Sequence, residues 1–118
     1  MELTAKEIAL KIAEILNEKK AEDIKVLEVS ALTSIGDYFI LCIGGSSTHI
    51  KALCDEVKEK MRDAGVLPLH NEGYNSANWL LMDYGSVVVH IFDREAAKFY
   101  DLERLWVDAP QLSLEHLN

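Results

Sequence analysis

Two β-rich segments around a glycine-containing turn constrain the fold of this chain more than any other feature. Residues 79–83 and 86–92 flank Tyr84-Gly85, an arrangement typical of a β-hairpin. A turn at Tyr84-Gly85 fixes which residues lie opposite each other on the two strands. The predicted cross-strand pairs are Met82 with Val87, Leu80 with Val89, and Trp79 with His90.

Alternation of side chains along the two strands gives the hairpin two faces of different chemistry. One face is aliphatic or thioether throughout: Leu80, Met82, Val87, Val89 and Ile91. The other face mixes aromatic, aliphatic and hydrogen-bonding side chains: Trp79, Leu81, Asp83, Ser86, Val88, His90 and Phe92. We interpret the first face as a wall of the core and the second as a surface that contacts something other than the core. A three-residue turn would change the pairing parity, so this division depends on the register.

The segments before the hairpin predict two helices and three strands. Thr4 and Glu7 have the spacing of a capping box, at the start of a helix that ends near Lys19-Lys20. The second helix is indicated by apolar residues at helical spacing: Ile50, Leu53, Cys54, Val57 and Met61. Strands are predicted at 24–29, 37–43 and 66–70. The first two flank the loop 30–36, and Pro68 favours an edge position for the third.

After the hairpin, Asp93 is the predicted cap of a last helix. Its apolar side is predicted to hold Phe99, Leu102, Leu105 and Trp106. The element order α-β-β-α-β-β-β-α predicts an α/β (α+β) fold, with a mixed five-stranded sheet and helices packed on it. We expect one domain over residues 1–110, with Pro110 ending the ordered fold and a C-terminal tail at 111–118.

Charge and composition limit the partners and the compartment. The 118 residues include 12 Lys and Arg against 20 Asp and Glu, a net charge of −8, without a basic cluster. Nucleic-acid binders usually carry a basic patch, so a basic protein is favoured over RNA or DNA as the partner. No segment predicts a membrane span or a targeting signal, and Cys42 and Cys54 fit reduced core thiols. We therefore expect a cytoplasmic location.

The junction Gly44-Gly45-Ser46-Ser47 is the most enzyme-like motif, because glycine-rich turns into helices can hold phosphate. A nucleotidyl transferase would also need a pair of acidic residues on a nearby strand to bind metal ions, and no such pair follows. A tight turn with a serine N-cap is the commoner explanation. The four histidines show no metal-ligand spacing, and no catalytic set is readable. We therefore predict no catalytic, cofactor-binding or metal-binding residues.

Trp79 and Tyr100 are either core aromatics or anchors of a protein interface, and their residue types alone leave both roles open. Lys98, on the predicted last helix, would alone be an ordinary solvated charge.

Over nearly its whole length the chain resembles the ribosomal silencing factor family, also called Iojap-like. The resemblance rests on the order and spacing of several motifs. They are Asp37-Tyr38-Phe39, Gly44-x-Ser46-Ser47, Glu72-Gly73, Trp79 with Leu81 and Asp83, His90 with Phe92, and Lys98-Phe99-Tyr100-x-Leu102-Glu103-x-Leu105-Trp106. Ile43 stands where a small polar residue is expected, and Lys98 stands where arginine is commoner. The lysine keeps the charge but loses bidentate geometry.

The resemblance implies a translational repressor without enzymatic activity. Such a protein would bind the large ribosomal subunit through ribosomal protein L-fourteen and block association with the small subunit, notably when nutrients are short. It implies a nucleotidyl-transferase-like scaffold, a monomer on the ribosome, and a homodimer as an option when free. The positions that match the family's docking surface are Trp79, Leu81, Lys98 and Tyr100. The alternative is a nucleotidyl transferase or nucleotide-binding protein that uses Gly44 to Ser47.

Overall fold

The computed structural model describes residues 3–32, 36–76, 78–100 and 109–112. Within these ranges, three helices and five strands follow one another in the predicted order. They are α1 Ala5–Glu18, β1 Glu22–Glu28, β2 Tyr38–Ile43, α2 Ser47–Asp63, β3 His70–Glu72, β4 Trp79–Asp83, β5 Val87–Phe92 and α3 Arg94–Tyr100.

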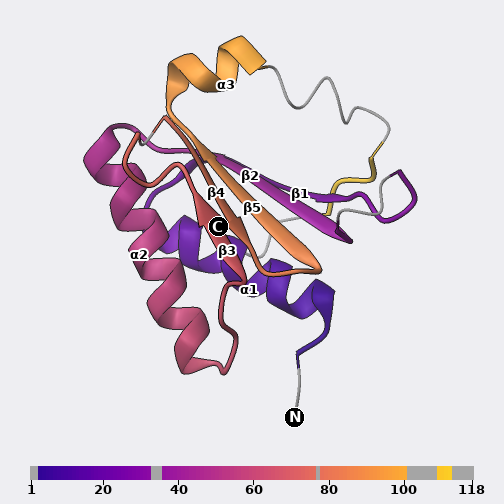
Figure 1. The fold of residues 1–118 in the computed structure, drawn as a ribbon. Coiled ribbons are helices and arrows are strands. Elements are labelled where there is room, and N and C mark those ends of the chain that lie inside the picture. The colour runs from indigo at the N-terminus through magenta and orange to yellow at the C-terminus, as the bar shows by residue number, and fades with distance from the viewer. Residues whose placement is uncertain (1–2, 33–35, 77, 101–108, 113–118) are drawn as a thin grey trace.

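The five strands of the described part form one sheet in the order β1-β2-β5-β4-β3. β2 and β5 run parallel, whereas the pairs β1–β2, β4–β5 and β3–β4 are antiparallel. The predicted α+β fold with a mixed five-stranded sheet is therefore confirmed. Figure 1 shows α1 and α2 packed along one side of the twisted sheet. In the same view α3 lies at the top, beyond the ends of the strands.

The main core lies between the sheet and the helices α1 and α2. The Thr4 hydroxyl accepts the Glu7 N–H at 3.1 Å, and the Glu7 carboxylate accepts the Thr4 N–H at 2.9 Å. This is the predicted capping box, and it fixes where α1 begins. The five apolar positions predicted for α2 are all fully buried: Ile50, Leu53, Cys54, Val57 and Met61. Local periodicity thus identified the face of α2 that packs on the sheet.

The hairpin β4–β5 has the predicted faces but a different register. Asp83 pairs with Val88, and the Tyr84 N–H donates to the Val87 carbonyl at 2.8 Å, so Gly85-Ser86 forms the turn. The predicted turn at Tyr84-Gly85 is wrong, and Trp79 lies opposite Phe92, not His90. Because every pair is displaced by two residues, the parity is unchanged and each side chain of β4 and β5 keeps its predicted face, while Ser86 moves into the turn. Gly85 has φ +86°, a value that favours glycine at this turn.

β2 occupies a central position, as its almost entirely apolar sequence predicts. Its residues 39–42 are buried, with side chains alternating between the two faces of the sheet. Cys42 on β2 and Cys54 on α2 are buried and free, as expected for reduced core thiols. None of the described helices combines the length and apolar character needed to cross a membrane.

At both edges of the sheet, the residues that take part differ from those predicted. The third strand covers His70–Glu72 and not 66–70, because Val66 to Leu69 lead into the sheet from the end of α2. At the other edge, Gln111 forms a β-bridge with Leu27, and the Leu112 N–H donates to the Val26 carbonyl at 2.9 Å. The prediction that the ordered fold ends at Pro110 is therefore wrong by at least two residues. The division into a domain at 1–110 and a tail at 111–118 stays a prediction.

The last helix begins where it was predicted. The Asp93 carboxylate accepts the Ala96 N–H at 2.7 Å, which caps α3. Ala96 is buried on the side of the sheet that does not pack against α1 and α2. Leu102, Leu105 and Trp106, predicted for the apolar side of this helix, lie outside the described residues, as does the side chain of Phe99.

Candidate functional site

The face of the sheet opposite α1 and α2 carries the predicted docking residues of β4. Much of it is a second apolar cluster of buried residues: Leu27, Val29, Phe39, Leu41, Val88, Phe92 and Ala96. Val88, His90 and Phe92 of the mixed hairpin face are therefore buried, contrary to the interpretation that this face contacts something other than the core. Trp79 and Leu81 lie two residues apart on β4, and both remain half-buried. They form the partly open margin of this cluster, which we call the Trp79 margin.

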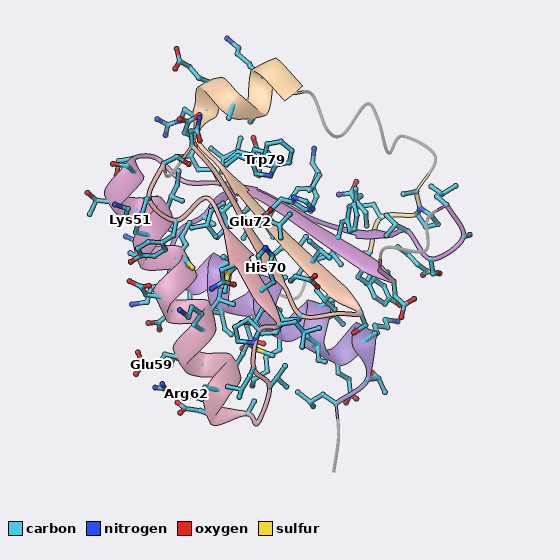
Figure 2. All side chains as sticks on the ribbon, in the orientation of Figure 1. Lys51, Glu59, Arg62, His70, Glu72 and Trp79 are labelled. Carbon is cyan, nitrogen blue, oxygen red and sulfur yellow. The ribbon has the colours of Figure 1, made fainter. Side chains whose placement is uncertain are left out.

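Aromatic contacts hold Trp79 at the margin. Its ring centroid lies 5.4 Å from that of Phe92, its cross-strand partner, with the planes at 33°. Its indole N–H donates to His90 Nδ1 at 3.2 Å. His90 lies opposite Leu81, so Trp79 reaches it diagonally across the two strands. Figure 2 shows Trp79 between the sheet and α3, above Glu72 and His70 in the view.

The structure shows why the Glu72-Gly73 motif has a glycine at its second position. This residue has φ +83°, and an added Cβ would lie 2.1 Å from the Trp79 carbonyl oxygen. Any side chain here would push the loop away from the start of β4. The motif alone does not reveal this contact with Trp79, because Gly73 and Trp79 approach each other only when β3 and β4 pair. We assign Gly73 to the support of the Trp79 margin.

Lys98 lies across a cleft from the strands. It is exposed on α3, and with Phe92 and Glu22 it borders a cleft of about 700 Å³ beside the ends of β1, β2 and β5. Phe92 therefore connects the two parts of the surface, since it contacts Trp79 and also lines the cleft. Trp79 and Leu81 come together on β4, and Lys98 stands on the neighbouring helix. Tyr100 ends α3, and its side chain lies outside what the structure describes.

An ion pair joins the two sides of this cleft. The Arg94 guanidinium on α3 donates two hydrogen bonds to the Glu22 carboxylate on β1, although 72 residues separate them in sequence. Both side chains are largely exposed, so we assign the pair a small contribution to stability. This pair was not predicted from the sequence, because no local pattern indicates a contact between residues so far apart. The pair links the start of α3 to the start of β1 across the cleft.

Both glycines of the Gly44–Ser47 junction use their backbone N–H groups within the fold. The Gly44 N–H donates to the Phe92 carbonyl at 2.8 Å, and the Gly45 N–H donates to His49 Nδ1 at 3.0 Å. Ser46 is the N-cap of α2 and accepts the His49 N–H at 3.1 Å. An added Cβ on Gly44 would lie 2.5 Å from Ile50 Cγ1, so this glycine allows close packing of α2 on β2. These contacts favour the tight-turn explanation over a phosphate cradle.

The titratable groups of the interior are held neutral. Burial lowers the pKa of His90 to about 4 and raises the pKa of Cys54 to about 11. The pKa of the Cys42 thiol is also raised by burial. These thiols are therefore poor nucleophiles at neutral pH. Across the described part of the chain, no group of three or more His, Cys, Asp or Glu side chains is placed to hold a metal ion.

Comparison with known proteins agrees with this arrangement of motifs. Residues 2–118 match the model of the family described as "Ribosomal silencing factor during starvation". The chain belongs to the ribosomal silencing factor family. The match extends through residues 111–118, beyond Trp106, the last residue of the motifs that carry the resemblance. The family consists of ribosomal silencing factors, which regulate translation and are not enzymes.

Relatives in bacteria and plants extend the comparison. The chain is 37% identical over 99 residues to the ribosomal silencing factor RsfS of Bacillus subtilis, covering 84% of each protein. It is 36% identical over 109 residues to the chloroplastic Iojap protein of Zea mays, covering 90% of this chain and 46% of that protein. A crystal structure of a protein from Chromobacterium violaceum superimposes with a TM-score of 0.86 at 35% identity, covering 96% of this chain and 93% of the other.

Proposed function

We propose that this protein is a translational repressor that binds the large ribosomal subunit through ribosomal protein L-fourteen. By occupying that surface it blocks association with the small subunit, notably under nutrient limitation. The observation that carries the proposal is the Trp79 margin, where half-buried Trp79 and Leu81 adjoin a cleft bordered by exposed Lys98. Membership of a family described as silencing ribosomes during starvation supports it.

Each docking residue has a distinct proposed role. Trp79 is the aromatic anchor, since large aromatic side chains contribute strongly to binding when a partner covers them. Leu81, its neighbour on the same face of β4, extends the apolar contact. Lys98 supplies a cation that pairs with an acidic or carbonyl group of the partner. Tyr100 joins this set because the resemblance places it on the family's docking surface.

The charge of the chain supports a protein dock. At a net charge of −8 the molecule as a whole is repelled by the phosphates of rRNA and attracted to a basic protein surface. A basic ribosomal protein is the partner that this charge favours, and we propose no direct nucleic-acid contact. We further propose that the protein acts in the cytoplasm, as a monomer on the ribosome and as a homodimer when free.

The steric mechanism predicts a stoichiometric effect on subunit joining. Purified protein, without nucleotide or metal, should reduce the association of small with large subunits and saturate near one copy per large subunit. Sedimentation of mixed subunits against rising protein concentration measures this directly. The effect should be strongest when the protein is added before the subunits meet. Undiminished association at saturating occupancy would overturn the steric mechanism, even with binding confirmed.

The alternative is a nucleotidyl transferase or nucleotide-binding protein on the nucleotidyl-transferase-like scaffold that the resemblance implies. It is disfavoured because the Gly44 and Gly45 N–H groups donate to Phe92 and His49. A thermal-shift measurement with nucleotide and magnesium decides between the two functions. We expect an unchanged melting temperature, and a clear rise would favour the alternative.

A further inference from the structure

The hydrogen bond between Trp79 and His90 fixes the tautomer of the neutral histidine ring. Its Nδ1 accepts the indole N–H at 3.2 Å, so the neutral ring carries its own proton on Nε2. The His90 side chain is buried, with 6% of its surface exposed, whereas Trp79 is only half-buried. The buried His90 Nδ1 therefore holds the indole N–H of the more exposed Trp79.

Packing on several sides holds the imidazole ring in place. Its centroid lies 5.0 Å from that of Phe39 on the neighbouring strand β2, with the planes at 59°. Phe92, two residues along β5, stacks at 6.2 Å with the planes at 6°. A ring held between these phenyl groups cannot turn freely. Its Nδ1 is thus a fixed point from which the orientation of the indole can be set.

Packing alone does not explain why this position holds a histidine. His90 Nε2 is buried, and it has no hydrogen-bond partner among the described residues. A buried N–H without an acceptor costs free energy, whereas a phenylalanine of similar shape would fill the same space without that cost. Trp79 is the one polar partner that the described structure gives the ring. The benefit of an imidazole at this position therefore lies in its bond to Trp79.

We propose that His90 is a positioning residue for docking: its Nδ1 holds the Trp79 indole in the orientation that the partner binds. This inference rests on the proposed function, in which Trp79 is the anchor. An anchor that is already oriented loses less conformational freedom when it binds, so the complex is tighter. The partner that this surface fits is accordingly a protein with a pocket for a pre-oriented indole ring.

Two substitutions at this position separate positioning from packing. His90→Phe keeps a ring against Phe39 and Phe92 but removes both the acceptor and the unpaired Nε2–H. We expect its melting temperature to equal or exceed that of the wild type, while affinity for the large subunit falls about tenfold. His90→Asn keeps an acceptor near the place of Nδ1 in a smaller side chain. We expect it to melt lower than the wild type yet bind with nearly the wild-type Kd. A purely structural role predicts that affinity follows stability in both variants.

The indole N–H gives a second readout that needs no ribosome. Comparison of ¹⁵N–¹H spectra of the wild type and Trp79→Ala identifies the Trp79 indole resonance, since the chain has only two tryptophans. We expect this resonance to shift, and its hydrogen exchange to accelerate, in His90→Phe but much less in His90→Asn. An unchanged resonance in His90→Phe, or wild-type affinity of that variant, would overturn the proposal.

Trp79→Ala, measured in the same binding assay, separates this proposal from the proposed function. If His90 acts through Trp79, then His90→Phe should weaken binding no further in the Trp79→Ala background. A further loss in that background would show that His90 acts by another route and would overturn the positioning role. If Trp79→Ala binds as tightly as the wild type, the assignment of Trp79 as the docking anchor fails. The indole resonance then decides alone whether His90 orients this side chain.

Discussion

Leu80 and Leu81 are adjacent leucines on β4, yet they belong to opposite sides of the molecule. Leu80 is fully buried under the helices α1 and α2, whereas Leu81 is half-buried at the Trp79 margin. The side chains on the helix-covered face are enclosed between the sheet and the helices α1 and α2. The other face is closed over most of its area but leaves a margin beside α3. Strand alternation alone thus places identical side chains, one residue apart, on opposite faces of the sheet.

The sharpest test of this contrast compares the two leucines. Leu80→Ala should lower the free energy of unfolding by about 2–5 kcal/mol, because it leaves a cavity in the main core. Leu81→Ala, the matched control, should cost about 1 kcal/mol, because part of its side chain already contacts water. Chemical denaturation of both variants measures the difference. Equal losses would show that the two faces are equally closed and would remove the distinction between them.

Removal of the proposed anchor, Trp79, should affect binding more than folding. Trp79→Ala should weaken binding to the large subunit by at least ~2 kcal/mol, as expected for a central aromatic residue. The protein should still unfold cooperatively, because the main core under α1 and α2 is untouched. Equilibrium binding to purified large subunits, with thermal melting as the control, tests both statements. A variant that melts near the wild type and binds equally well would show that Trp79 is no anchor.

The histidine under the margin should make stability depend on pH. The pKa of His90 is lowered to about 4 in the folded protein, whereas an unfolded histidine has a pKa of about 6.5. As the pH falls through this window the unfolded chain binds a proton that the folded chain does not, so stability is lost. Between pH 7.5 and about pH 5 we expect His90 to account for a loss of roughly 2 kcal/mol.

Comparison with His90→Phe isolates this contribution from the acidic side chains. The wild type should lose more stability than the variant over the same pH range, because the variant lacks the titrating imidazole. Denaturation curves at the two pH values give the difference directly. Parallel losses in the two proteins would mean that the imidazole is accessible to protons in the folded state.

The smallest effect is expected at the exposed cation beside the cleft. Lys98→Glu should slow association with the large subunit and weaken binding modestly, because it reverses the positive charge that we propose to meet the partner. Association rates at low and high salt separate steering from direct contact, since salt screens the steering contribution. Faster association of the variant would indicate that the partner surface beside Lys98 is basic. An unchanged rate at both salt concentrations would place Lys98 outside the interface.

Local patterns predicted much of the fold. The capping box of α1, the buried face of α2 and the two faces of the hairpin are confirmed, because each depends on residues close together in sequence. Of the candidate site, the structure brings Trp79 and Leu81 together and places Lys98 across a cleft lined by Phe92. That these residues dock on a ribosomal protein stays a prediction. Gly73 and Arg94 were missed as parts of this surface, because their contacts are with distant segments.

The sequence by itself determined the order of elements and the division of the hairpin into two faces. Both follow from the periods of helix and strand, which backbone geometry sets residue by residue. Only the tertiary structure decided that Trp79 lies opposite Phe92, that β3 starts at His70, and that Glu22 meets Arg94. A shift of two residues preserves every alternation, so no local pattern distinguishes the registers. The choice between them falls to the turn and to the packing of whole strands against their neighbours, which are properties of the assembled fold.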